Sequence, residues 1–162
     1  MNHRNTLYSI LDLALVSEGQ SLQHTFTNTL ALAQSAEKSG YTRYWLAEHH
    51  NSENIGSSAT SILIGYVAQG TQSIRVGSGG IMLPNHSPLI IAEQFGTLAS
   101  LYPNRIDLGL GRAPGTDRET AEAIRADFMQ ASQMFPKELE RIQTYFSADN
   151  KNAKVRATVA EG

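Results

Sequence analysis

The stretch that decides the fold lies between Ser73 and Gly115 and reads SIRVGSGGIMLPNHSPLIIAEQFGTLASLYPNRIDLGLGRAPG. It contains two short β-rich runs, Ile74–Val76 and Arg105–Leu108, and glycines follow each of them. Between the two runs, residues 88–101 carry apolar side chains at the spacing of one buried helix face. The pattern therefore predicts a βαβ unit whose strand ends lack side chains, and such bare backbone is typical of sites where a ligand comes close.

The rest of the chain extends this alternation of strands and helices. We expect strands at residues 8–16 and 43–47, and helices at 25–39, from Ser57 or Ser58 to 70, at 117–127 and at 138–146. Four strands that are each followed by a helix predict a parallel α/β fold with right-handed crossovers. Both an open doubly wound sheet and the first half of a (β/α)8 barrel fit this count, because a closed barrel needs eight strands and typically about 250 residues.

Composition narrows the class of protein further. A chain of 162 residues, of which 41% are hydrophobic and 17% charged, can bury the core of one domain, and we expect residues 1–162 to form it. Thirteen Lys and Arg against fifteen Asp and Glu leave no basic surplus for nucleic acid. The absence of cysteine excludes disulfides, thiolate metal ligands and a cysteine nucleophile. With no signal-peptide pattern and no apolar run of membrane-spanning length, we expect a soluble, cytoplasmic protein.

The segment Glu48-His49-His50 places a carboxylate and two imidazoles at the end of the second predicted strand. In extended backbone Glu48 and His50 share one face, and His49 takes the other. Histidine can donate or accept a proton near neutral pH, and a carboxylate can fix its tautomer. This pattern favours acid–base chemistry, although one of the histidines could instead be a packing residue. A metal site that adds His86 and His24 is a further alternative, but the spacing matches no common zinc pattern.

The glycine groups do not complete a phosphate-binding fingerprint, because Gly109-x-Gly111 lacks a third glycine at the required spacing and no lysine follows. Arg112 is nevertheless a candidate anion ligand, since it lies between a glycine-rich strand end and the start of a predicted helix. The alternative is a surface arginine that pairs with Asp117 or Glu119.

Three segments together resemble a known family: TRYWLAEHHN (42–51), GSGGIMLPNHSPLIIAEQFGTLASLYPNRIDLGLGRAPG (77–115) and YSILDLA (8–14). The chain is similar throughout its length to the N-terminal half of bacterial-luciferase-like flavin-dependent monooxygenases. The resemblance implies a (β/α)8 TIM barrel, of which this chain is the first half, truncated before the fifth strand. It also implies reduced flavin mononucleotide (FMN) as cofactor, with a deazaflavin as the open alternative, and molecular oxygen as co-substrate.

The resemblance further implies partners and residue roles. It implies a homodimer packed through the second and third helices, and the missing strands suggest a complementing C-terminal half as another partner. His49 is the implied acid–base group, supported by Glu48. Gly79 and Gly80 match a non-prolyl cis peptide on which the flavin ring rests. The implied cofactor-binding residues are Gly79, Gly80, His50 and Arg112.

Three functional hypotheses remain open at this point. The first is a flavin-dependent monooxygenase that oxidises a small organic substrate with oxygen and reduced flavin. The second is a non-catalytic half barrel that binds flavin weakly or only dimerises. The third, a metal-dependent hydrolase, requires a bound divalent metal. None of them involves nucleic acid or a membrane.

Overall fold

A computed structural model describes residues 6–161, so residues 1–5 and 162, at the ends of the expected domain, lie outside the described part. The strands are β1 (Ser9–Asp12), β2 (Arg43–Leu46), β3 (Arg75–Met82) and β4 (Ile106–Gly111). The helices are α1 (Leu22–Lys38), α2 (Thr60–Gln69), α3 (Pro88–Leu101), α4 (Arg118–Ile124), α5 (Phe128–Gln133) and α6 (Phe135–Phe146), with short 3-10 turns η1 (Leu83–Asn85) and η2 (Ala148–Asn152). Within residues 6–161, no helix combines the length and apolar character needed to span a bilayer.

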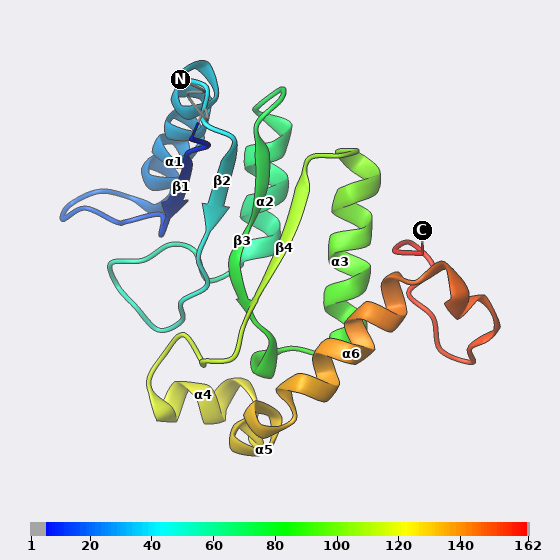
Figure 1. Ribbon diagram of the computed structural model, residues 1–162. Helices are drawn as coiled ribbons and strands as arrows, with labels where there is room; N and C mark the ends of the chain where they lie inside the picture. Colours follow the sequence, from blue (N-terminus) through cyan, green and yellow to red (C-terminus); the bar gives the residue numbers. More distant parts are fainter. Residues whose placement is uncertain (1–5, 162) are drawn as a thin grey trace.

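The four strands form one parallel sheet in the order β1-β2-β3-β4. Each strand pairs with the next strand in the sequence, so the sheet grows in a single direction. A doubly wound sheet would reverse direction at a switch point. The sequential order is that of a barrel, and Figure 1 shows the carboxyl ends of the strands gathered at the edge where α4 and α5 lie.

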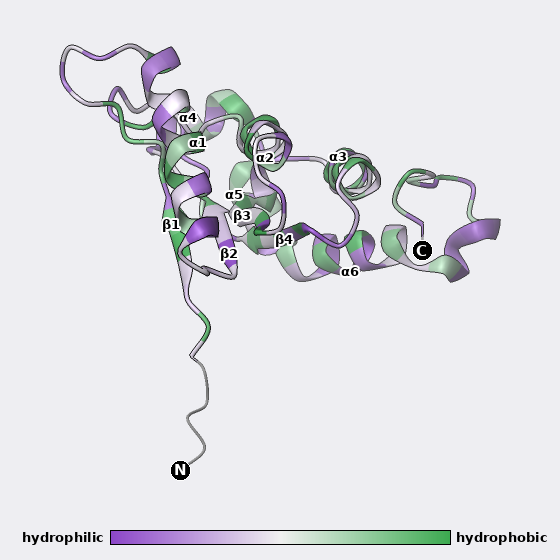
Figure 2. Ribbon diagram, turned by 90° about the horizontal axis from the view of Figure 1, so that it is seen from above, coloured by the Kyte–Doolittle hydropathy of each residue, from purple (hydrophilic) through white to green (hydrophobic). Residues whose placement is uncertain are grey.

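One face of the sheet is covered by α1, α2 and α3 (Figure 2). The core on this face includes Tyr44 and Leu46 from β2, Val76 from β3, and Phe95 from α3, all of them buried. The opposite face is open. Leu11 on β1 points to that side and is therefore 55% exposed. The site described below lies where this open face meets the carboxyl ends of the strands.

Local sequence signals account for several helix boundaries. Ser21 caps α1, because its side chain accepts a hydrogen bond from the His24 backbone N–H at 3.2 Å. Gly40 follows α1 with a φ of +79°, as expected for a left-handed residue after a helix. Helix α3 begins at Pro88, where a missing N–H costs no hydrogen bond.

Several predicted boundaries were wrong: α1 and α6 each begin three residues earlier than expected, and α4 ends three residues earlier. The first strand ends at Asp12 rather than residue 16, since Ala14 has a φ of +51° and its N–H donates to Asp12 Oδ1. The expected serine cap of α2 is absent, and α2 begins after Ala59 without a side-chain cap. The Thr60 hydroxyl instead donates to the backbone carbonyls of Ala47 and Ser57. In addition, β3 continues through its glycines to Met82, and α5 was not predicted.

Glu37 joins the end of α1 to the turn that leads into β3. Its carboxylate accepts backbone N–H bonds from Gln72 at 2.9 Å, Ser73 at 2.5 Å and Ile74 at 2.8 Å. Partial burial would raise the pKa of Glu37, but these N–H groups lower it to about 2. The charged form is therefore favoured by the fold.

Because the folded pKa of Glu37 lies below its ordinary value, its contribution to stability is complete above about pH 4.5 and is lost as the pH falls toward 2. We expect Glu37→Gln to lower the free energy of unfolding at neutral pH by about 1 kcal/mol, allowing for solvent screening. The variant should also lose less stability between pH 4.5 and pH 2. Urea unfolding at a series of pH values measures this, with exposed Glu140→Gln as the control. A pH dependence that runs parallel to that of the native chain would contradict the assignment.

Candidate active site at the carboxyl ends of the strands

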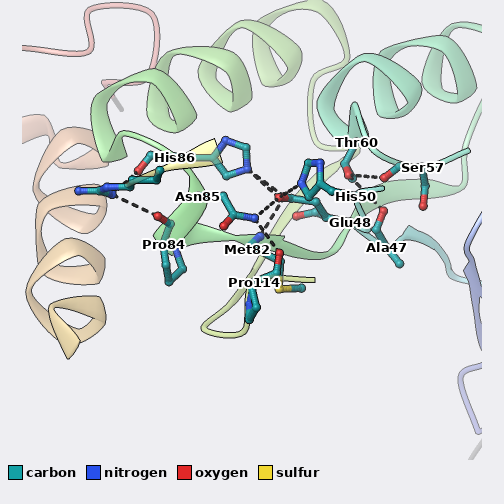
Figure 3. A network of polar contacts seen from close by, with 12 residues as sticks. Ala47, Glu48, His50, Ser57, Thr60, Met82, Pro84, Asn85, His86 and Pro114 are labelled. Carbon is teal, nitrogen blue, oxygen red and sulfur yellow. Dashed lines mark hydrogen bonds and ion pairs between the residues drawn. The ribbon is translucent and has the colours of Figure 1, made fainter. Parts of the chain in front are cut away.

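A buried carboxylate lies just beyond the end of β2. Glu48 is 1% exposed, and its Oε1 accepts hydrogen bonds from His50 Nε2 at 2.8 Å, His86 Nε2 at 2.9 Å and Asn85 Nδ2 at 3.2 Å. Its Oε2 accepts from the Met82 backbone N–H at 2.9 Å and lies 3.0 Å from His86 Nε2. Figure 3 shows Glu48 between the two imidazole rings. We call Glu48, His50 and His86 the carboxylate–histidine cluster.

The cluster fixes the tautomer of both rings. Burial alone would raise the pKa of Glu48, but the hydrogen bond and charge of His86, with the hydrogen bonds of His50 and Met82, lower it below 4.5. An ionised carboxylate only accepts hydrogen bonds, so each Nε2 must carry a hydrogen. In a neutral ring this leaves Nδ1 as the acceptor. Each neutral imidazole would thus present Nδ1 as its free acceptor.

The same cluster joins the loops that follow β2, β3 and β4 (Figure 3). Asn85 Nδ2, which donates to Glu48, also donates to the Pro114 carbonyl at 2.8 Å. The His50 backbone N–H donates to the Gly115 carbonyl at 3.1 Å. Gly115 has a φ of +67°, and a Cβ there would lie 2.6 Å from the Glu48 carbonyl oxygen, so this approach requires glycine.

The backbone is bare where β3 and β4 run side by side. The cis peptide expected between Gly79 and Gly80 is confirmed. The pairing of β3 with β4 shifts between Ser78 and Ile81, which leaves Gly109 alone opposite these two glycines. A Cβ on Gly80 would lie 2.9 Å from the Gly109 carbonyl oxygen. We call Gly79, Gly80 and Gly109 the glycine strip.

Two apolar side chains flank the strip on the open face. A Cβ on Gly79 would lie 3.0 Å from Trp45 Cβ and 3.1 Å from Leu11 Cδ1. Gly79 itself is exposed. The strip is therefore a bare, accessible surface with apolar walls, which suits a flat ring.

Ser78 secures the strip, a role that sequence reasoning missed. Its buried Oγ donates to the Gly109 carbonyl at 2.8 Å and accepts from the Gly109 N–H at 3.0 Å. One hydroxyl thereby satisfies both backbone groups of the residue opposite the bulge. The available signal was a lone polar side chain within a glycine run in a buried strand.

The structure places the remaining candidates apart from the cluster. As expected from strand alternation, Glu48 and His50 share one side, and His49 instead lines a cavity of about 570 Å³. Arg112 is exposed, and its Nε donates to the Ser132 carbonyl at 3.1 Å. The alternative pairing of Arg112 with Asp117 or Glu119 does not occur in residues 6–161.

Asp117 is engaged elsewhere, because its side chain caps α4 by accepting from the Thr120 N–H at 2.9 Å. The metal-site alternative added His86 and His24 as possible further ligands. His86 joins the cluster, whereas His24 is exposed in the first turn of α1. In the described part of the chain, no group of three or more His, Asp or Glu side chains could hold a metal ion.

These parts define a class of protein: a parallel βα half barrel with bare backbone and acid–base side chains at the carboxyl ends of its strands, where barrels carry their active sites. The chain belongs to the luciferase-like monooxygenase family, whose profile matches residues 8–149. It is 56% identical to YvbT of Bacillus subtilis (strain 168), over 98% of this chain and 47% of that protein. It is 52% identical to a luciferase-like monooxygenase of Escherichia coli (strain K12), over 100% of this chain and 48% of that protein. The chain thus spans about half the length of these curated relatives.

Solved structures share the fold. Apo-MsnO8 matches with a TM-score of 0.87 and 38% identity, over 94% of this chain and 46% of that chain. The oxygenating constituent of a Pseudomonas putida 3,6-diketocamphane monooxygenase, in complex with FMN, matches with a TM-score of 0.72 and 22% identity. The match covers 86% of this chain and 39% of that chain. An F420-dependent secondary alcohol dehydrogenase matches with a TM-score of 0.55 and 19% identity, over 80% of this chain and 41% of that chain. The expected fold class is confirmed: four parallel strands alternate with helices as in the first part of these barrels.

The tautomer assignment is testable in the chain as it exists. We expect long-range 1H–15N spectra at about pH 8.5, well above the ordinary imidazole pKa, to show Nε2–H tautomers for His50 and His86. In Glu48→Gln the new amide can donate to one Nε2, so at least one ring should change to the Nδ1–H form. The variant should also lose about 1–3 kcal/mol of stability, because buried donors lose their acceptor.

The control is Glu53→Gln, which changes an exposed carboxylate on the same loop. Unaltered imidazole spectra in Glu48→Gln would show that Glu48 does not set the tautomers.

Proposed function

We propose that this chain supplies the flavin-contacting half of a flavin-dependent monooxygenase that oxidises a small organic substrate with molecular oxygen and reduced flavin. The observation that carries the proposal is the exposed glycine strip, which has no side chain where a planar ring would lie. Family membership supports it, because the strip and the cluster occupy the end of the barrel where active sites form.

The residues present fit a flavin. The strip would contact the ring, and the flanking Leu11 and Trp45 would add apolar contact at its edges. Arg112 is exposed close to the end of β4 and would hold a phosphate by charge-assisted hydrogen bonds. When bound, the flavin supplies the redox chemistry with oxygen. FMN is the first candidate and a deazaflavin the second, because structures of related fold contain one or the other.

The chain's own side chains would transfer protons and hold the reacting groups in position. His49, which lines the cavity beside the cluster, is the proposed acid–base group. Glu48 is the proposed positioning group, since it fixes the rings of His50 and His86 and has no exposed surface of its own to offer a substrate. His50 would contribute a Nδ1 acceptor toward the cofactor.

A second function is favoured by one observation: the chain spans about half of its curated relatives. Alone, it would be a half barrel that binds flavin weakly or only associates with other chains. Exposed Tyr66 on α2 and Ile90 on α3 support association through these helices. The proposed partner is a second copy or a chain that supplies the C-terminal half.

Reconstitution separates the two functions. We expect the 162-residue chain, mixed with reduced FMN, to consume no more oxygen than free FMN does. A version extended by the C-terminal half of the 56% identical relative should bind FMN and consume oxygen with a small organic substrate. An oxygen electrode and FMN fluorescence measure both properties. If the extended version binds no flavin, the monooxygenase proposal is wrong.

The role of Arg112 is tested by comparing two ligands in the extended version. Riboflavin lacks the phosphate of FMN, so Arg112→Met should weaken FMN binding about tenfold and leave riboflavin binding unchanged. Arg118→Met is the matched control, because the Arg118 side chain is 88% exposed and pairs only with Glu122 in the described part. Equal loss for both ligands would show that Arg112 acts on the fold rather than on the phosphate.

A further inference from the structure

The cavity lined by His49 is not explained by the flavin contacts. It has a volume of about 570 Å³, within the range of small-molecule sites. Its lining residues belong to the loops that follow β1 and β2 and to the first turns of α1 and α2. Figure 1 shows these elements at the carboxyl side of the sheet. Its apolar walls are Val16, Leu22, Phe26, Ile55, Ile62 and Leu63, and the uncharged polar residues Gln20, Asn51, Ser52 and Ser58 also line it.

Backbone contacts between the two loops form the floor of the cavity. Leu15 and Ile55 form an antiparallel bridge, and the Val16 N–H donates to the Asn54 carbonyl at 2.9 Å. Gly56 allows the loops to meet, because its N–H donates to the Ala14 carbonyl at 2.9 Å and a Cβ there would lie 3.2 Å from that oxygen. The cavity is therefore held open by the fold and does not depend on a rearrangement of the loops.

The charges around the cavity restrict what it can hold. No lysine or arginine is among the described residues that line it, and its one acidic residue, Glu53, is exposed. A phosphate or carboxylate would find no permanent countercharge there and would meet the Glu53 carboxylate. The apolar walls instead favour an uncharged, largely hydrocarbon group. Among the described residues of the lining, His49 is the one histidine.

We propose that this cavity is the substrate subsite and that it takes an uncharged apolar group, such as an alkyl, thioether or aromatic moiety, with His49 beside the group to be oxidised. The inference rests on the proposed monooxygenase function for the identity of the ligand as a substrate. The binding preference itself rests only on the walls and charges of the cavity.

The test uses the 162-residue chain without flavin, so that its result is independent of cofactor binding. N-phenyl-1-naphthylamine, an uncharged fluorescent probe, is titrated into the native chain and two variants. Leu22→Glu places a charge in the cavity wall, at a helix start where an acidic residue is tolerated. Leu32→Glu is the matched control, because Leu32 is a partly exposed leucine of the same helix, away from the cavity.

We expect Leu22→Glu to weaken probe binding at least about tenfold and Leu32→Glu to change it less than about twofold. Amide shift changes on probe binding should concentrate in residues 14–26 and 49–63. Methyl phenyl sulfide should displace the probe, whereas benzoate should need at least about tenfold higher concentration.

Three results would overturn the subsite: equal weakening by both variants, displacement by benzoate as readily as by the sulfide, or shift changes centred on Leu11, Trp45 and Gly79. The last result would place the probe on the open face of the sheet. Failure of the extended version to bind FMN would instead remove the monooxygenase role and leave the binding preference of the cavity in place.

Discussion

The architecture of the site depends on one buried carboxylate. An ionised group that is 1% exposed is stable only when several donors replace its water, because an unpaired buried charge costs several kcal/mol. Glu48 receives donors from the ends of β2 and β3 and from the turn after β3. Each hydrogen bond to a charged group contributes about 1.5–3 kcal/mol, so the donors are held in place as firmly as the carboxylate. Two imidazole rings consequently have fixed orientations and tautomers.

The glycine strip and the carboxylate–histidine cluster are coupled through β3. Gly80 belongs to the strip, and two residues later the Met82 N–H donates to Glu48. A shift of the Glu48 carboxylate would therefore move the strand end that carries the strip. Ser78 holds the other side of the bulge by bonding both backbone groups of Gly109. The surface proposed for the flavin ring is thus fixed at both ends by polar side chains that do not touch the ring.

Local patterns predicted the elements well, and long-range pairs could not be predicted from them. Helix α3 was expected at residues 88–101 and begins and ends there, because a proline start and an apolar period are both written into its own sequence. Glu48 and His50 were expected on one side because side chains alternate in extended backbone, which is also a local property of the sequence. His86 is 38 positions from Glu48, and Ser78 is 31 positions from Gly109, so only the packed sheet brings these pairs together. The glycines themselves indicated a bare strand end where a ligand could come close, and the resemblance to a family added the cis peptide and the flavin ring.

The open face of the sheet differs between the amino and the carboxyl ends of its strands. Near the amino ends of the strands, Asp107 pairs with Arg43 at 3.0 Å and also with Arg75. Burial would raise the pKa of Asp107, but these arginines lower it, so the carboxylate stays charged. Because these charged groups on β2, β3 and β4 already have partners, they need no further polar contact from a group that covers this face. Toward the carboxyl ends, the same face presents Leu11, Trp45 and bare glycine, and apolar surfaces of this kind gain most from contact with an apolar ring. On this face, the amino ends of the strands therefore carry ion pairs, and the carboxyl ends carry the uncharged surface proposed for the flavin ring.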